Sequence, residues 1–287
     1  MNTLVRQRLI RSLFALSRRS GLGRGQLAKF VAQLPEHLLP LLLPLLLLGL
    51  WQLATAQAWL PPQILPAPAL VAQTFVELGQ GGELLDNLAI SLQRILWSTL
   101  IGGGTGLLLG VAMGLSPRVK AYLYPSFELV AQFPVVGWIP LLIVFLGIDE
   151  ALKIAAVSLA VVLPVVLGTL RGIQNQPATL LEVGAVYGFT PLQRCFRIAL
   201  PAALPDIFTG LRQGVMQAWL SLVFVELLAS SEGIGYLMVW GRQLMQLDIV
   251  FVGILVIGAV GFAMDKLLGY LEANLNARLG GQVGGGT

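Results

Sequence analysis

The sequence predicts an all-α integral membrane protein, and three observations support that class. Hydrophobic residues make up 56% of the 287 residues and charged residues only 11%, whereas about 25% of the residues in a soluble domain are charged. The apolar residues form stretches long enough to cross the ~30 Å hydrocarbon core as helices. Lys and Arg residues are concentrated in alternate loops. We therefore expect six transmembrane helices, near residues 37–55, 88–115, 122–147, 152–170, 205–228 and 249–271.

Prolines indicate where these helices should deviate from regular geometry. Pro40 and Pro44 lie in the first turns of the first span, and Pro164 lies within the fourth. Pro134 and Pro140 interrupt the third span. Because proline removes a helical hydrogen bond and clashes with the preceding turn, we expect the third span to be kinked or split.

The charges also predict the orientation of the chain. Residues 1–35 contain seven basic residues and no acid, whereas loop 56–87 contains Glu77, Glu83 and Asp86 and no Lys or Arg. The bias alternates along the remaining loops, and the loop after the fourth span is basic again. Positive loops face the cytoplasm, so we expect both termini inside. The net charge of +4 follows from this bias and does not indicate nucleic-acid binding.

The chain divides into a transmembrane domain, residues 36–275, and two flanking segments. Residues 1–35 interleave basic and apolar residues and predict an amphipathic helix on the inner leaflet; a disordered basic tail is the alternative. Residues 276–287 form a Gly-rich cytoplasmic tail, and we expect disorder from residue 280 onward.

Four glycines follow one another at a spacing of four in the second span. This spacing places them on one helix face, where another backbone can approach closely. Close packing within the bundle is the usual use of such a face, and a sliding surface is the alternative. The four residues are Gly102, Gly106, Gly110 and Gly114.

Loop 171–204 contains start and stop signals for two short helices. The first covers Glu182 to Gly188, with Gly188 as the C′ residue. Thr190 and Gln193 flank Pro191 in the form of a capping box. The second helix should run to about residue 200, where the next prolines, Pro201 and Pro205, should stop it. Two capped helices outside the membrane favour a docking surface for a soluble partner; an ordinary structured loop is the alternative.

The same loop resembles the cytoplasmic "EAA" loop of ABC importer permeases. In that family a Glu-Ala-Ala triplet precedes a glycine by the same interval, and Ile-x-Leu-Pro follows. Here Val183 and Gly184 replace the two alanines, and Gly184 should weaken the helix by about 1 kcal/mol relative to alanine. The matching positions, to which the resemblance assigns the contact with the ATPase, are Glu182, Gly184, Gly188, Ile198, Leu200 and Pro201.

The resemblance extends over roughly residues 45–275. It includes Leu65-Pro66-Ala67-Pro68 after the first span, Ser91-Leu92-Gln93-Arg94, Trp138-Ile139-Pro140-Leu141, and Glu226 followed by Gly233-Ile234-Gly235-Tyr236-Leu237. Together these stretches are similar to the branch that contains sulfonate, taurine and nitrate permeases. The run from Gly147 to Ile154 is most similar to the aliphatic sulfonate permeases.

This resemblance implies a type I ABC importer permease fold with a cytoplasmic coupling helix, in the inner membrane. It implies a homodimer, two ATP-binding subunits inside that hold ATP and Mg, and a substrate-binding protein that docks outside on loops 56–87, 147–152 and 229–248. The implied substrate is a small anion, an aliphatic sulfonate or taurine; nitrate, bicarbonate and a vitamin precursor are alternatives within the same class.

Polar residues in the spans are candidates for the translocation path. The candidates are Arg94, Gln93, Gln132, Trp138, Gln217 and Glu226. A charge within a span is costly and indicates function, and an anion path would favour Arg and amide donors. The alternative is that Arg94 and Glu226 form a structural pair or reach the membrane interface.

The sequence contains no recognisable catalytic or metal site. A P-loop requires Gly-Lys-Ser/Thr, but the four lysines follow Ala, Val, Leu and Asp. His37 is the only histidine and Cys195 the only cysteine, which argues against an intramembrane enzyme. An ion-coupled secondary transporter, the remaining rival, should show inverted repeats, and no clear repeat is present. We therefore expect a permease subunit whose ATP is hydrolysed by another chain.

Overall fold

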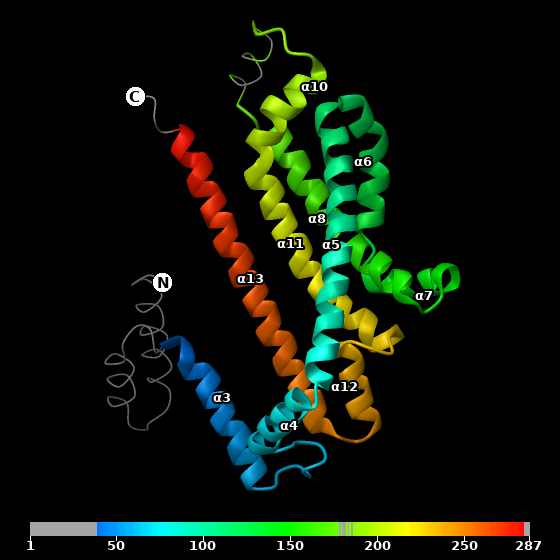
Figure 1. Cartoon of the computed structure of the whole chain (residues 1–287), viewed down its shortest axis with the longest axis vertical. Helices are drawn as coiled ribbons and strands as arrows, with labels where there is room; N and C mark the ends of the chain where they lie inside the picture. Colours follow the sequence, from blue (N-terminus) through cyan, green and yellow to red (C-terminus); the bar gives the residue numbers. More distant parts are fainter. Residues whose placement is uncertain (1–38, 178, 180–181, 183, 185, 284–287) are drawn as a thin grey trace, which may run out of the picture. The chain divides into compact units, whose positions relative to one another are not determined.

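The computed structural model describes residues 39–177, 179, 182, 184 and 186–283, and every regular element within them is helical (Figure 1). The predicted amphipathic helix of residues 1–35 and His37 lie outside the described residues. The chain divides into two compact units, residues 1–69 and 70–287.

The first unit contains one apolar helix, α3 (Leu39–Ala56), which includes Pro44. The chain then turns through residues 57–67, where the Trp51 indole N–H donates a hydrogen bond of 3.0 Å to the Pro66 carbonyl. This bond holds the end of α3 against the Leu-Pro-Ala-Pro segment.

The core of the second unit is built from three long helices: α5 (Glu83–Leu115), α8 (Glu150–Gln174) and α11 (Leu200–Ala229). α8 packs against both α5 and α11, and its core residues Val157, Val161 and Val166 are fully buried. Trp219 of α11 is also buried and donates to the Ile257 carbonyl of α13 (Leu247–Val283). The core therefore follows the apolar, small-residue faces of these helices.

The third predicted span is split, as Pro134 indicated. It consists of α6 (Pro117–Ala131) and α7 (Val135–Leu146), which meet at an angle of 97°. Pro134 is the N-cap of α7 in an extended conformation, while Pro140 lies inside α7 without ending it. The prediction of a break is confirmed, and the break is sharper than a kink.

Short helices complete both ends of the second unit (Figure 1). α4 (Pro68–Gln80) and α12 (Ile234–Gln243) lie at the end where α5 begins, and the Thr74 hydroxyl donates to the Asp248 carboxylate at 2.7 Å. α10 (Pro191–Arg194) lies at the opposite end.

The junction between α10 and α11 differs from the prediction. Residues Cys195–Ala199 form a π-helical turn that leads directly into α11, so neither Pro201 nor Pro205 stops the helix. In the π turn Leu200 donates to the Cys195 carbonyl, five residues back. We attribute the continuity through Pro201 to this wider turn, which relieves the clash that a proline makes with the preceding turn of an α-helix. Pro205 lies inside α11 without ending it. Cys195 is consequently buried in a helix and is not part of a loop.

Among the described residues, four helices are long and apolar enough to cross a membrane, and the bent pair α6–α7 would make a fifth. α3 is apolar but shorter. The class of multi-pass α-helical membrane protein is thus confirmed, while the count of six spans stays a prediction. α13 continues to Val283 and so enters the segment for which we expected disorder.

Candidate functional site

The turn between the two short helices of loop 171–204 is formed by Gly188. Its φ of +62° lies in the left-handed region, and the Phe189 N–H donates to the Gly184 carbonyl at 3.0 Å. This 6→1 bond is that of a Schellman motif with glycine at C′. Gly184 is buried, and a Cβ there would lie 2.8 Å from the Ile198 Cδ1 atom. Glycine at position 184 therefore leaves room for the end of the Ile198 side chain, which comes from the π turn Cys195–Ala199.

The capping box at the start of α10 is confirmed. The Gln193 N–H donates to the Thr190 hydroxyl at 3.3 Å, and the Thr190 N–H donates to the Gln193 side chain at 2.9 Å. Pro191 occupies the first helical position. These bonds fix the direction in which the chain leaves the Gly188 turn.

Large apolar side chains project from this turn. Val186 is 85% exposed and Tyr187 72%, and Leu192 and Phe196 are also well exposed. We call these four residues the tip surface. The Glu182 side chain is also exposed. The role of these residues in coupling stays a prediction at this point.

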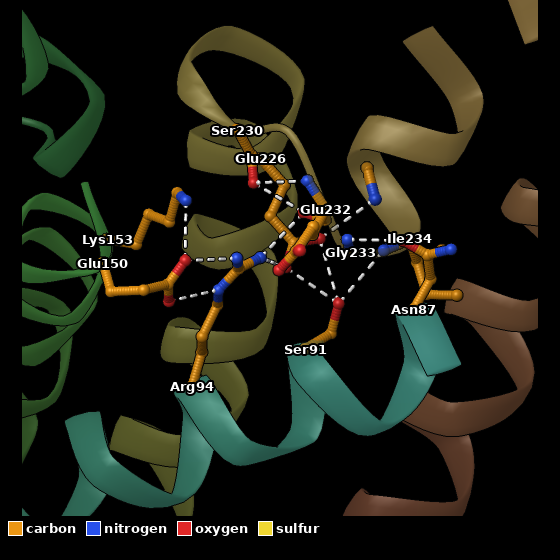
Figure 2. A network of polar contacts seen from close by, with 11 residues as sticks. Asn87, Ser91, Arg94, Glu150, Lys153, Glu226, Ser230, Glu232, Gly233 and Ile234 are labelled. Atoms are coloured by element: carbon orange, nitrogen blue, oxygen red, sulfur yellow. Dashed lines mark hydrogen bonds and ion pairs between the residues drawn. The ribbon is translucent and has the colours of Figure 1, made fainter. Parts of the chain in front are cut away.

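A buried network of charges lies at the other end of α5 (Figure 2). The Arg94 side chain is 2% exposed and that of Glu226 1%, and the Arg94 Nη1 atom lies 2.8 Å from the Glu226 Oε1 atom. The other edge of the guanidinium binds Glu150 through two bonds of 2.6 and 2.9 Å. Lys153, also buried, lies 2.7 Å from Glu150. The network therefore contains two cations and two carboxylates, and only Glu150 is substantially exposed.

The same network holds the turn between α11 and α12. Asn87, Ser91 and Arg94 rise from one face of α5 toward this turn (Figure 2). Their side chains bind the Gly233 N–H, the Ile234 N–H and the Glu232 carbonyl, respectively.

Glu226 binds the N-terminal end of α12. Its carboxylate accepts from the Ser91 hydroxyl and from the Gly235 N–H. Gly233 has a φ of +105°, and an added Cβ would collide with the Glu226 carboxylate. The motif Ser91-x-x-Arg94 and the motif Glu226-x6-Gly233 are thus two halves of one structure.

Sequence reasoning considered the pair of Arg94 and Glu226 but missed Glu150 and Lys153. Both residues lie in the run from Gly147 to Ile154, which resembles the aliphatic sulfonate permeases. Their spacing of three at the start of a predicted span was the available signal, because acids and bases three apart are neighbours on a helix.

The four glycines of α5 face α8. A Cβ at Gly106 would lie 2.9 Å from the Val165 Cβ, and one at Gly110 would lie 2.5 Å from the Thr169 Cβ. A Cβ at Gly102 would collide with the Ser158 carbonyl, and one at Gly114 would lie 2.9 Å from Ile173. Each glycine therefore allows the two helices to approach closely.

The residues predicted to line the translocation path lie in different parts of the structure. Gln132, Trp138 and Gln217 line one cavity of about 280 Å³ beside the break between α6 and α7. Arg94 and Glu226 belong to the buried network, and Gln93 is exposed on α5. Whether any of these residues contacts a transported ion stays a prediction.

A second charged cluster between α11 and α13 was also missed. Arg212 lies 2.6 Å from Asp265 and 2.6 Å from Glu272, which also accepts from the Thr209 hydroxyl. Arg212 falls inside a predicted span, so its position in the sequence was the available signal. No group of three or more potential metal ligands occurs in the described part of the chain.

The long apolar helices of the described residues are those of a multi-pass membrane protein. Residues 102–277 match the family described as "Binding-protein-dependent transport system inner membrane component". The chain therefore belongs to this family, the permeases of ABC transporters.

Relatives in the same family are similar over most of their length. A protein of Bacillus subtilis called "Putative aliphatic sulfonates transport permease protein SsuC" is 38% identical over 82% of this chain and 85% of its own. The protein of that name from Escherichia coli is 37% identical over 81% and 89%. The Escherichia coli taurine transport system permease protein TauC is 33% identical over 81% and 86%.

Proposed function

We propose that this chain is the membrane-spanning subunit of an ATP-driven importer that carries a small organic sulfonate. The names of the relatives support an alkanesulfonate or taurine as substrate. Nitrate, bicarbonate and a vitamin precursor remain alternatives within the same class of transporter. In this proposal the chain lies in the inner membrane with both termini and the α10 end in the cytoplasm.

The tip surface is the observation that carries this proposal. Val186, Tyr187, Leu192 and Phe196 expose apolar surface on a turn that is fixed by a glycine and a capping box. Exposed apolar patches on ordered turns are typical of docking sites. A cleft in an ATP-binding subunit would cover this surface as a helix-in-groove contact. ATP and Mg²⁺ would then be bound by that subunit.

The proposed assembly contains two copies of the chain. Each copy offers one tip surface, so two copies engage two ATP-binding subunits. The end of the second unit that carries α4 and α12 would face a substrate-binding protein outside the cell. Movement of the ATP-binding subunits would then switch the permease between two conformations.

Replacement of Gly188 by valine tests the docking role. At a φ of +62°, a β-branched residue is strained, and a non-glycine residue in this region costs about 1–2 kcal/mol. We expect Gly188→Val to displace the tip surface, so that the ATP-binding subunits are lost during purification of the tagged chain. Uptake of radiolabelled ethanesulfonate or taurine should fall to background.

Gly258 provides the matched control because a Cβ there would meet nothing within 4 Å. Gly258→Val should retain both the ATP-binding subunits and uptake. If Gly188→Val and a further variant, Tyr187→Asp, both keep them, the tip surface is not the docking site. If deletion of the gene leaves sulfonate and taurine uptake unchanged, the proposed substrate class is wrong.

A further inference from the structure

The break in the third span opens onto a cavity that can hold a small molecule. The cavity lies among the C-terminal end of α6, the N-terminal end of α7, α8 and Gln217 of α11. Its volume of about 280 Å³ is close to the lower end of ligand pockets, which start at about 300 Å³. Irregular backbone at membrane depth is tolerated where it lines a cavity, and broken helices commonly form substrate sites.

Most of the wall of this cavity is apolar and aromatic. Phe127, Phe133 and Trp138 contribute rings, and Phe133 and Trp138 meet edge to face with centroids 5.8 Å apart. Leu159 and Leu163 of α8 form part of the opposite wall. None of the described residues that line the cavity is charged. Such a wall stabilises a hydrocarbon group and offers no counter-ion to an ammonium group.

The polar groups at the cavity are suited to an anion. Gln132 and Gln217 carry amide N–H₂ donors at the exposed rim of the cavity. One N–H of Gln132 donates to the Glu128 carbonyl at 3.4 Å, which leaves its second N–H for a ligand. α7 begins at Pro134 without a side-chain cap, so the N–H groups of Val135 and Val136 have no acceptor within the helix. The positive end of a 12-residue helix thus lies at the cavity wall. Neutral donors and a helix N-terminus are a recurrent way to bind an oxyanion.

We propose that this cavity binds an alkanesulfonate, with the hydrocarbon tail among the Phe133 and Trp138 rings and the sulfonate at the amide donors and the α7 N-terminus. The proposal rests on the proposed function and selects one substrate class within it. Taurine would place an unpaired ammonium group against the apolar wall. Nitrate would gain nothing from that wall because it has no tail.

The two carboxylates of the cluster around Arg212 do not line this cavity. Gln217 also lines a second cavity, which contains Arg212, Asp265 and Glu272. There the two carboxylates are already paired with Arg212. A substrate in the first cavity therefore meets no free carboxylate from the residues that line it.

Direct binding to the permease tests this inference, because uptake would also report the choice made by a substrate-binding protein. The full-length chain with its ATP-binding subunits is placed in lipid nanodiscs, and binding of ethane-, propane- and butanesulfonate, taurine and nitrate is measured by calorimetry. Each added methylene should strengthen binding about fourfold, so that butanesulfonate binds about 15-fold more tightly than ethanesulfonate. Taurine should bind at least about tenfold more weakly than propanesulfonate, which has a methyl group in place of the ammonium group.

Variants then assign the effect to the cavity. Trp138→Ala should flatten the dependence on tail length, whereas Trp97→Ala, at an exposed position on α5, should preserve it. Gln217→Leu should weaken the binding of all the sulfonates by a similar factor. Gln213→Leu, one turn away in the second cavity, should leave their affinities unchanged.

Two results with the unmodified chain would overturn the inference. In the first, ethane-, propane- and butanesulfonate bind with equal affinity; in the second, taurine binds more tightly than propanesulfonate. Unchanged tail dependence in Trp138→Ala together with unchanged affinities in Gln217→Leu would do the same. In each of these cases the proposed function stands as long as the ATP-binding subunits and sulfonate uptake are retained. Loss of both in the unmodified chain would instead reject the proposed function.

Discussion

Replacement of Arg94 by glutamine should destabilise the fold because it removes the counter-ion of a buried carboxylate. Among the described residues, Arg94 is the only cation that contacts Glu226, whose side chain is 1% exposed. Without it, Glu226 keeps the Ser91 hydroxyl and the Gly235 N–H but has no opposite charge. Removing one partner of a buried ion pair costs about 3–5 kcal/mol because the other charge is left uncompensated.

The geometry also predicts the order of the related variants. Glu226→Gln should cost less than Arg94→Gln, because Arg94 keeps the two bonds of 2.6 and 2.9 Å to Glu150. The double variant Arg94→Gln/Glu226→Gln should be more stable than Arg94→Gln alone, since it leaves no unpaired charge at Glu226. Glu150 and Lys153 remain paired in all three variants.

Thermal unfolding of the purified chain in detergent measures this order. A loss of 3–5 kcal/mol corresponds to a decrease of roughly 6–20 °C in the melting temperature at about 2–4 °C per kcal/mol. Arg278→Gln, at an exposed position on α13, is the control and should melt with the unmodified chain.

Two results would refute this reasoning. A melting temperature of Arg94→Gln within a few degrees of the unmodified chain would show that Glu226 does not need its counter-ion. A double variant no more stable than Arg94→Gln would show that the loss has another origin. Near-normal stability with abolished uptake would instead favour a role for Arg94 in the translocation path.

Two further predictions concern helix packing and topology. Gly106→Ala should destabilise the chain by roughly 1–3 kcal/mol, because its Cβ would lie 2.9 Å from the Val165 Cβ, whereas Gly104→Ala, which meets nothing within 4 Å, should not; equal melting temperatures would contradict close packing. In a Cys195→Ser background, an impermeant maleimide applied to intact cells should label Gln80→Cys and not Gln193→Cys, and the reverse pattern would invert the proposed orientation.

Features that depend on neighbouring residues were predictable from the sequence. The break at Pro134 follows from the missing N–H of proline, and the capping box of Thr190 and Gln193 follows from bonds between residues three apart. The all-helical membrane class follows from apolar stretches that leave the backbone no other way to satisfy its hydrogen bonds.

Features that depend on contacts between distant segments were not predictable. The sequence contains several carboxylates that could pair with Arg94. Glu150 becomes its partner only because α8 packs against α5. The π turn before Pro201 depends on how α11 is held, so proline alone indicated a stop that the chain does not make. The partners of Arg212 lie 53 and 60 residues further along the chain, and no local pattern connects them.

The distribution of buried surface indicates which part of the second unit can move at least cost. α8 buries 15 of its 25 residues, whereas α6 buries none and α7 only Ile139. α8 also approaches α11 so closely that a Cβ at Gly168 would lie 2.6 Å from the Asp206 carbonyl. Separation of α8 from α5 or α11 would therefore expose packed backbone. A shift of α6 and α7 would expose side chains instead, chiefly Ile139 and the partly buried residues of both helices that pack against the core.

The alkanesulfonate cavity that we infer lies at the boundary between these two parts. Its wall combines Trp138 of the loosely held α7 with Leu159 of the tightly packed α8. A ligand can shift a conformational equilibrium only by the difference between its affinities for the two states. A substrate that contacts both walls has such a difference, because movement of α7 removes the aromatic half of its site. A substrate held by α8 and α11 alone would bind equally well in both positions of α7 and could not bias the switch.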